Sequence, residues 1–446
     1  MDVKISLVGA GSASFGLETL YDIASSEELH NCTVALIDID ENKLKIMTKV
    51  AKRFNEYFKA DLKLESYTST KEGLSGSEFV IIAVEKERMK RWWLDYRIPH
   101  KYGIKQVLGE CGGPGGLAHT LRIVPLVLEI CRDAEDLCPN ALIMNYSNPE
   151  AKVAYAINRY TKLKVVGLCP GIYGRMMWLS TVLGRQVEAL AAGLNHFTWI
   201  LKLWFKDSGE DAYPTIMERL KQKSELKVSS EDVNRDPLLV KQPLSRVLCL
   251  TYGYYPSPSD GHVGEYISYA WELVPNEERG DNWLRGVENW SERIRETAMK
   301  IATGKLTVER YKAPELIRGE KGQAVNIIRA MLSNRRYFEY AVNVPNKGII
   351  DNLPSDIVVE VPAVVDGSGI HPIHIGRLPT GIDALCYTQA IIQRLSVEAA
   401  YEGSYEKALQ ALLIDPVVHD AEAAKKTLDE FLEVHAPLLP QFDMRH

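Results

Sequence analysis

The N-terminal segment places a glycine-rich turn directly between an apolar strand and a helix. Residues 3–8 form a short apolar run, Gly9-Ala10-Gly11-Ser12 follow it, and residues 13–25 have a helical pattern. Gly9 permits a tight turn and Gly11 lets the backbone approach a ligand closely, while Ser14 stands where a third glycine is usual. The free N–H groups at the start of such a helix favour phosphate. The segment therefore predicts the first unit of a nucleotide-binding parallel sheet.

Short apolar runs and longer helical patterns alternate through the first 195 residues, which predicts a parallel sheet covered by helices on both faces. The expected strands are residues 3–8, 33–37, 79–84, 141–144, 165–168 and 189–194, with helices at 13–25, 41–57 and 118–134. The second half mixes expected strands at 197–206, 340–344 and 357–361 with expected helices at 280–303, 319–335 and 380–433. The predicted fold class is α/β, with a Rossmann-like domain over residues 1–195 and a mixed α+β domain over residues 196–446.

The second strand ends in an acidic pair, Asp38 and Asp40. Asp38 is placed to bind the hydroxyl groups of an adenosine ribose, and it would repel a 2′-phosphate. The alternative is that one of the two acids only caps the helix beginning at Glu41. Since no basic residue for a 2′-phosphate is adjacent, NAD is favoured over NADP. The residues expected to contact this cofactor are Gly9, Gly11, Ser12, Phe15, Asp38, Val84 and Asn145.

The charged residues nearly balance, with 53 Lys and Arg against 59 Asp and Glu and a formal net charge of −6. Because nucleic acids and anionic membranes bind a basic face, neither is expected as a partner. No uninterrupted apolar run is long enough to span a membrane, no leader precedes the first strand, and the seven cysteines are scattered. These features predict a cytoplasmic protein.

Four further motifs stand near strand ends or before a long helix. They are Gly113-Pro114-Gly115-Gly116, Asn145-Tyr146-Ser147-Asn148-Pro149, Gly167-Leu168-Cys169-Pro170-Gly171 and Gly193-Leu194-Asn195-His196. Later segments at residues 344–354 and 358–362 complete the set. Their joint occurrence in this order resembles glycoside hydrolase family 4 over nearly the whole chain.

The resemblance implies a glycosidase that uses NAD and a divalent metal, and a second domain of the lactate and malate dehydrogenase kind. The Cys169 thiolate and the His196 imidazole would hold the metal, which in the family is usually Mn²⁺ and sometimes another ion such as Co²⁺ or Ni²⁺. These two residues form one site if the sixth and seventh strands are neighbours. No site could be inferred from their spacing alone.

The implied reaction is a redox-assisted elimination instead of two-carboxylate hydrolysis. NAD takes a hydride from C3 of the sugar, the metal acidifies the C2 proton, a base removes that proton, and the C1–O bond breaks. Water then adds and the hydride returns to C3, so that NAD is regenerated. This route tolerates either anomeric configuration.

A segment from Tyr252 to Tyr266 is similar to a family segment that lines the site. Asp260 is the first candidate for the base, with Tyr254 or Tyr255 as rivals. A carboxylate near a divalent cation is expected to have a lowered pKa and to stay ionised. The alternative is a polar loop whose Asp and His only shape a turn. Substrate contacts are expected from Asn148, Glu110 and His262.

Pro170 follows Cys169 at a position where the family commonly has Asp, Asn or His. Proline cannot donate a proton through its side chain, so a general acid must come from elsewhere. Unphosphorylated α-glucosides are favoured, while galactosides, uronides and both anomers remain open. A dehydrogenase and a non-hydrolytic NAD and sugar binder are the alternative classes. A homodimer or homotetramer is expected, with residues 91–96 as a buried surface or substrate wall.

Overall fold

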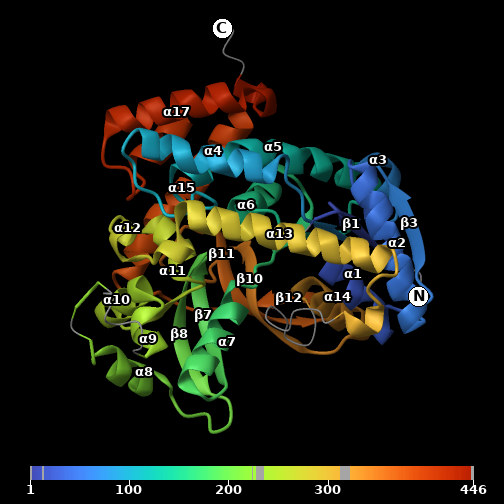
Figure 1. The fold of residues 1–446 in the computed structure, drawn as a ribbon, viewed down its shortest axis with the longest axis horizontal. Helices are drawn as coiled ribbons and strands as arrows, with labels where there is room; N and C mark the ends of the chain where they lie inside the picture. The colour runs from blue at the N-terminus through green and yellow to red at the C-terminus, as the bar shows by residue number, and fades with distance from the viewer. Residues whose placement is uncertain (1–2, 13–14, 224, 228–235, 312–321, 443–446) are drawn as a thin grey trace.

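A single mixed sheet runs through the protein (Figure 1). The computed structural model describes residues 3–12, 15–223, 225–227, 236–311 and 322–442. In this part of the chain the strand order is β3-β2-β1-β4-β5-β6-β10-β11-β7-β8-β9, and β12 pairs with β11. The strands are β1 Lys4–Val8, β2 Thr33–Ile37, β3 Lys63–Tyr67, β4 Phe79–Ile82, β5 Leu142–Asn145, β6 Lys164–Gly167, β7 Val187–Leu194, β8 Phe197–Phe205, β9 Tyr255–Ser257, β10 Tyr337–Pro345, β11 Val358–Asp366 and β12 Gly369–Pro372.

The six N-terminal strands pair in parallel, as the alternating pattern predicts. The central strands β1, β2 and β4 are short and mainly apolar, and almost all of their residues are buried because helices cover both faces. Strand β3 and helices α3, α4, α6 and α7 were not predicted from the sequence. The helices of this half are α1 Gly16–Ala24, α2 Glu41–Phe58, α3 Thr70–Gly73, α4 Arg88–Lys101, α5 Gly113–Leu137, α6 Glu150–Tyr160 and α7 Gly171–Leu183.

The C-terminal strands β10 and β11 enter the sheet between β6 and β7, so the sixth and seventh strands are not neighbours and the condition set for joining Cys169 and His196 is not met. Strand β10 is antiparallel to both β6 and β11, and β11 is antiparallel to β7. Strand β7 therefore runs antiparallel to β6. The expected division at residue 195 falls in the turn between β7 and β8, which pair with each other.

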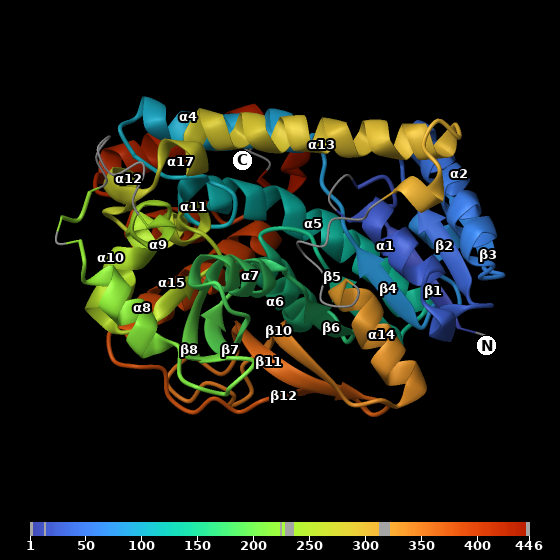
Figure 2. The ribbon, with the colours of Figure 1, turned by 60° about the horizontal axis from the view of Figure 1, so that its bottom comes forward.

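The helices of the second half surround the added strands. They are α8 Tyr213–Leu220, α9 Pro237–Val240, α10 Pro243–Tyr252, α11 Asp260–Val263, α12 Ala270–Leu273, α13 Gly280–Ala302, α14 Gln323–Ser333, α15 Ile382–Glu402, α16 Tyr405–Leu413 and α17 Ala421–His435. Figure 2 shows α13 running along the same side of the molecule as α4 and α2. None of the described helices combines the length and the apolar character that crossing a membrane requires.

A buried ionic cluster ties α4, α5 and α17 together. Both carboxylate oxygens of Asp95 accept hydrogen bonds from Arg122, at 2.8 and 2.6 Å, and Oδ1 lies 2.8 Å from Nε2 of His435. Burial opposes ionisation of Asp95, but Arg122 and His435 hold the pKa of its carboxyl group below the ordinary value. This cluster fixes the C-terminal helix on the N-terminal half.

Candidate active site

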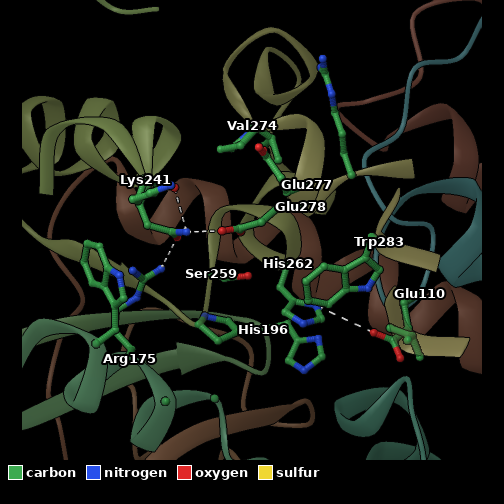
Figure 3. Close-up of a pocket in the computed structure, with 18 of the residues that line it drawn as sticks. Glu110, Arg175, His196, Lys241, Ser259, His262, Val274, Glu277, Glu278 and Trp283 are labelled. Atoms are coloured by element: carbon green, nitrogen blue, oxygen red, sulfur yellow. Dashed lines mark hydrogen bonds and ion pairs between the residues drawn. The ribbon is translucent and has the colours of Figure 1, made fainter. Parts of the chain in front are cut away.

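A cavity of about 1270 Å³ opens beside the ends of β5 and β6 and the turn after β7. Its wall is built from segments far apart in the sequence, including α4, the start of α7, the turn before α11 and one face of α13. In Figure 3, His196, His262 and Glu110 lie together in this cavity. The sequence-predicted residues among the lining are Phe15, Glu110, Asn148, Cys169, His196 and His262.

The glycine-rich turn has the predicted backbone shape. Gly9 has φ +84°, and a Cβ there would lie 2.2 Å from the carbonyl oxygen of Ala83 on the neighbouring strand connection. A Cβ on Gly16 would lie 2.3 Å from the carbonyl oxygen of Ala10. Gly16 therefore provides the close approach of helix and strand that a third glycine usually gives. Ser14, assigned that place from the sequence, lies outside the described residues.

The two acids after β2 have different structural roles. Asp40 is the N-cap of α2, and its Oδ1 accepts hydrogen bonds from the backbone N–H groups of Asn42 and Lys43, at 3.1 Å each. Asp38 lies in the turn, where Oδ2 accepts from the N–H of Gly11 at 2.8 Å. Asp40 therefore caps the helix, which was the alternative considered for one of the two acids. The Asp38 carboxylate lies next to the glycine turn.

The other predicted cofactor contacts lie along the ends of β4 and β5. The ring of Phe15 stacks on Tyr146 with a centroid distance of 4.3 Å, and both rings line the cavity. The N–H of Val84 donates to Oγ of Ser147 at 2.9 Å. Asn145 is fully buried and bonds through its amide group to the backbone of Ser147, so it shapes this turn and does not line the cavity.

Cys169 and His196 line the same cavity although two strands separate β6 from β7. His196 is 6% exposed with φ +60°, and its Nδ1 has no hydrogen-bond partner among the described residues. Burial, aided by the neighbouring His262, lowers the pKa of His196 well below its ordinary value, which favours the neutral imidazole that binds metals. A buried imidazole with an unpaired nitrogen, on a cavity that a cysteine also lines, fits a metal site.

Glu360, which the sequence analysis did not single out, anchors the turn before His196. Its carboxylate is 3% exposed and accepts hydrogen bonds from Oγ1 of Thr198 at 2.5 Å and from the side-chain amides of Asn195 at 2.8 Å and Asn343 at 3.2 Å. Burial raises the pKa of this carboxyl group. The sequence signal that marks it is one acid within the buried apolar run of residues 358–363 in β11.

Glu110 is 4% exposed and is held at two sides. Its Oε1 accepts hydrogen bonds from the guanidinium of Arg88 at 2.7 Å and from the amide of Asn148 at 3.0 Å. Arg88 also lies 3.3 Å from Glu85, so its charge is matched by two carboxylates. Oε2 of Glu110 lies 3.8 Å from Nδ1 of His262.

The structure does not bring Asp260, Tyr254 or Tyr255 to the cavity wall. Asp260 is fully buried, and its carboxylate accepts the N–H groups of Leu244 at 2.6 Å and Ser245 at 2.8 Å at the start of α10. Burial and the nearby charge of Glu278 raise its pKa to about 7, opposite to the lowering expected from the sequence. Asp260 thus has a structural role, as in the alternative considered from the sequence, but the N–H groups that it binds belong to the start of α10 and not to its own turn. Tyr255 is buried in β9.

Pro170 is the N-cap of α7 and lines the cavity beside Cys169. Of the run 91–96, which forms part of α4, Trp92 lines the cavity and donates from Nε1 to the carbonyl of Leu108 at 3.0 Å. Its neighbours Arg91, Asp95 and Tyr96 are also buried within the chain. The run therefore contributes to the cavity wall and to the core.

Comparisons with known proteins cover almost the entire chain. Residues 4–185 match the family described as Family 4 glycosyl hydrolase, and residues 191–418 match the Family 4 glycosyl hydrolase C-terminal domain. The chain is 35% identical to an alpha-glucosidase of Erwinia rhapontici, covering 98% of this chain and 99% of the relative, and 33% identical to an alpha-galactosidase of Bacillus subtilis, with the same coverage. A solved 6-phospho-alpha-glucosidase from gut microorganisms, in complex with NAD and Mn²⁺, has a TM-score of 0.81 at 22% identity, covering 99% of this chain and 100% of that one.

Proposed function

Because the chain belongs to family 4 of the glycosyl hydrolases, we propose that it hydrolyses small glycosides with NAD and a divalent metal, Mn²⁺ or an ion such as Co²⁺ or Ni²⁺. The observation that carries this proposal is the buried, unpaired Nδ1 of His196, on the cavity that Cys169 also lines. The fold shared with a solved relative that holds NAD and Mn²⁺ supports it further.

The glycine turn and the acid beside it would hold the dinucleotide. Gly9, Gly11 and Ser12 offer backbone close to a pyrophosphate, and the Asp38 carboxylate next to Gly11 accepts ribose hydroxyl groups. Phe15 lies between this turn and the cavity, where the nicotinamide end would meet the sugar. When bound, NAD accepts a hydride from C3 of the sugar and returns it, and the metal, held by Cys169 and His196, acts as a Lewis acid on sugar oxygens.

We propose that the substrate is an unphosphorylated sugar. Arg88, one of several cations on the cavity wall, is paired with Glu85 and Glu110 and is therefore poorly placed to bind a phosphate. Trp283, Val287 and Trp290 present an apolar stripe of α13 to the cavity, at the spacing of one helix face. This stripe suits the faces of a sugar ring or an apolar aglycone. The similarity to an alpha-glucosidase then favours α-glucosides.

A group that faces the cavity must take the C2 proton. Of the residues proposed from the sequence, Glu110 and His262 line the cavity and can accept a proton, whereas Asp260, Tyr254 and Tyr255 do not line it. We therefore place the base at one of these two side chains. The Glu110→Gln and His262→Asn variants distinguish these two side chains. The variant that removes the base is expected to lower kcat on every substrate, and the other variant is not.

The test of the proposed function is hydrolysis of nitrophenyl α- and β-glycosides by the purified protein with NAD, Mn²⁺ and a thiol reductant. The proposal predicts release of nitrophenol that stops when either NAD or the metal is withdrawn. Full activity without both would refute the cofactor requirement. Accumulation of NADH in proportion to substrate would instead identify a dehydrogenase.

We also propose that the protein is a cytoplasmic homo-oligomer. All seven cysteines are buried and free, which suits a reducing compartment. Tyr387 on α15 is 50% exposed, and exposed aromatic side chains of this kind are enriched at subunit contacts. Light scattering that returns the mass of a single chain at assay concentration would refute the oligomer.

A further inference from the structure

A polar corner of the cavity lies between α7 and the turn before α11. Arg175 on α7 is 2% exposed and lines the cavity, and its Nε has no hydrogen-bond partner among the described residues. Ser259 also lines the cavity, and its buried hydroxyl oxygen has no partner in the described part of the chain. Because buried polar atoms without partners are costly, both groups are expected to bind a ligand of the cavity.

The guanidinium of Arg175 is fixed by four neighbours. Its Nη2 donates to Oε1 of Gln242 at 3.0 Å and to Oγ of Ser245 at 3.4 Å. The guanidinium carbon also lies 5.1 Å from the ring centroid of Trp178 and 5.0 Å from that of Tyr255. These contacts hold the group in one orientation and leave its Nε–H unused.

Arg175 and Ser259 meet at one point. The backbone N–H of Asp260, the residue directly after Ser259, donates to Oε1 of Gln242 at 2.8 Å. This is the same oxygen that accepts from Arg175, so the guanidinium and the Ser259 peptide are neighbours across Gln242. The two free groups can therefore bind one ligand together.

The charge of Arg175 is already offset by two acids. Gln242 links Arg175 to Glu278, since its Nε2 donates to Oε1 of that residue. Burial and Glu278 raise the pKa of Asp260 while Arg175 opposes this rise, so the guanidinium also interacts with the Asp260 carboxyl group. A further anion is not needed to balance Arg175. The free Nε–H, which can only donate, suits a neutral oxygen such as a sugar hydroxyl.

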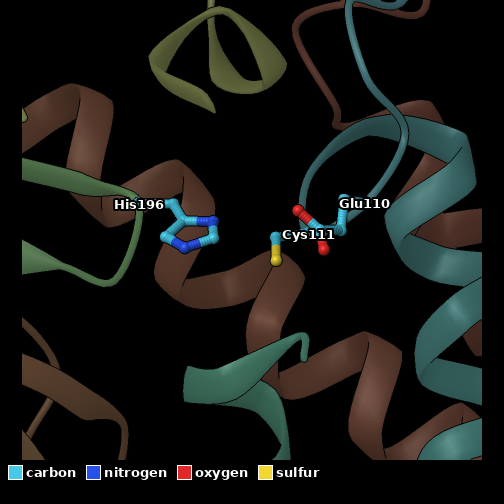
Figure 4. Close-up of side chains that lie close together, drawn as sticks. All are labelled: Glu110, Cys111 and His196. Atoms are coloured by element: carbon cyan, nitrogen blue, oxygen red, sulfur yellow. The ribbon is translucent and has the colours of Figure 1, made fainter. Parts of the chain in front are cut away.

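The residues proposed for the chemistry lie at another part of the cavity. Figure 4 shows Glu110 and Cys111 beside His196, and the ligand atoms of the three lie within 4.8 Å of one another. Oε1 of the fully buried Glu265 fixes this segment, since it accepts the N–H groups of Glu110 at 2.6 Å and Cys111 at 3.0 Å. In Figure 3, Glu110 and Arg175 lie at opposite sides of the cavity.

The strand order also separates the polar corner from the nucleotide half. Tyr255, on which Arg175 packs, belongs to β9 at one end of the strand order, whereas β1 and the glycine turn lie on the other side of β6. Cys169 follows β6, between the two. A Cβ on Gly171 would lie 3.5 Å from Sγ of Cys169, and Arg175 follows Gly171 by one helix turn, about 5.4 Å along the axis. Arg175 is thus next to a sugar held at Cys169, on the side away from the cofactor.

We propose that Arg175 and Ser259 bind the leaving group, and that this leaving group is a neutral sugar, so that the substrate is a disaccharide. The proposal rests on the proposed function, because it takes the reacting sugar to be bound beside Cys169 and His196. The Nε–H of Arg175 donates to one hydroxyl of the second sugar, and the Ser259 hydroxyl bonds with a neighbouring one. Both contacts lie away from the reacting carbon atoms, so these residues decide which leaving group is bound.

Kinetics on two α-glucosides, with NAD and Mn²⁺ present, test the proposal. Maltose has glucose as its leaving group, and phenyl α-glucoside has a ring without hydroxyl groups. The readout is the ratio of kcat/KM on maltose to kcat/KM on phenyl α-glucoside. Ser259→Ala removes a hydroxyl that has no partner among the described residues, so this variant is expected to fold. Loss of one neutral hydrogen bond should lower the ratio about threefold to tenfold, through a higher KM on maltose.

Arg175→Lys keeps the positive charge near Asp260 but removes the Nε–H, and it should lower the ratio by at least about tenfold. Circular dichroism confirms that the variant is folded. Ser396→Ala is the matched control, because it removes another buried hydroxyl without a described partner, on α15 and outside the cavity wall. This control should keep the wild-type ratio.

The outcomes distinguish the subsite from the proposed function. An unchanged ratio in both Ser259→Ala and Arg175→Lys would refute the subsite, while NAD- and metal-dependent cleavage of phenyl α-glucoside would leave the proposed function standing. A wild-type protein that cleaves neither substrate would refute the α-glucosidase on which the subsite rests. A preference for a disaccharide with a uronic acid as leaving group over maltose would place an anion at Arg175 and overturn the neutral sugar.

Discussion

Replacing Glu360 by Gln tests how the fold positions the metal site. The wild-type carboxylate accepts hydrogen bonds from Thr198, Asn195 and Asn343 while it is almost completely buried. A glutamine has the same shape but points an NH₂ group at one of these donors. The variant therefore loses one charge-assisted hydrogen bond, worth about 1.5–3 kcal/mol, and leaves a buried donor unpaired at a cost of about 1–3 kcal/mol. Together these two losses give an expected destabilisation of about 2.5–6 kcal/mol.

The same change should weaken metal binding, because Asn195 directly precedes His196. Removal of a group that orients a metal ligand typically lowers affinity by about 10–100-fold. Calorimetric titration with Mn²⁺ measures this affinity, and urea unfolding followed by tryptophan fluorescence measures the stability.

Glu339→Gln is a matched control for Glu360→Gln. Glu339 is also fully buried, lies on the neighbouring strand β10, and accepts hydrogen bonds from Tyr173 at 2.7 Å and Gln323 at 3.0 Å, but it does not line the cavity. This variant should lose stability and keep wild-type metal affinity. If Glu360→Gln binds Mn²⁺ as tightly as the wild type, Glu360 does not position His196 and the reasoning fails.

Three other predictions concern the fold. Gly16→Ala would place a Cβ 2.3 Å from the carbonyl oxygen of Ala10, so we expect the free energy of unfolding in urea to fall by about 1–3 kcal/mol. We also expect weaker NAD binding in a fluorescence titration. Unchanged NAD affinity would contradict the role of this contact. Asp95→Asn breaks the buried pair with Arg122 and should destabilise the chain by about 3–5 kcal/mol, and a loss below about 1 kcal/mol would contradict it. Asp260, whose pKa burial raises to about 7, binds its proton more tightly in the folded chain, so its stabilising contribution is present below about pH 4 and is lost as the pH rises through about 7. The urea midpoint of Asp260→Asn should fall less than that of the wild type between about pH 4.5 and about pH 7.5, and equal falls would contradict this.

The nucleotide half of the fold was predictable because its signals are local. In strands β1, β2 and β4, consecutive residues are mainly apolar, and this local pattern predicts burial on both faces of the sheet. The order of the remaining strands is not local. Strand β10 meets β6 at the pair Asn343 and Gly167, and β11 meets β7 at Glu360 and Gly193. No pattern within either strand specifies such a partner, so the entry of β10 and β11 between β6 and β7 could not be read from the sequence.

The site was predictable only in part for the same reason. Cys169 and His196 were inferred from the family motifs, and both line the cavity. Glu265 was missed because its backbone partners lie more than 150 positions earlier in the chain. Asp260 was predicted to be the base because its segment is similar to a family segment that lines the site. In the structure, the free N–H groups at the start of α10 bind its carboxylate and hold it away from the cavity.

Hydrolysis in D₂O is the measurement that tests the central claim most directly. If the C1–O bond breaks after removal of the C2 proton, the released sugar carries deuterium at C2, since the proton that returns there comes from solvent. NMR of the free sugar, with NAD and Mn²⁺ present, is expected to show deuterium at C2 and hydrogen at C3. A released sugar with hydrogen at C2 would contradict the elimination route and would point to direct displacement at C1.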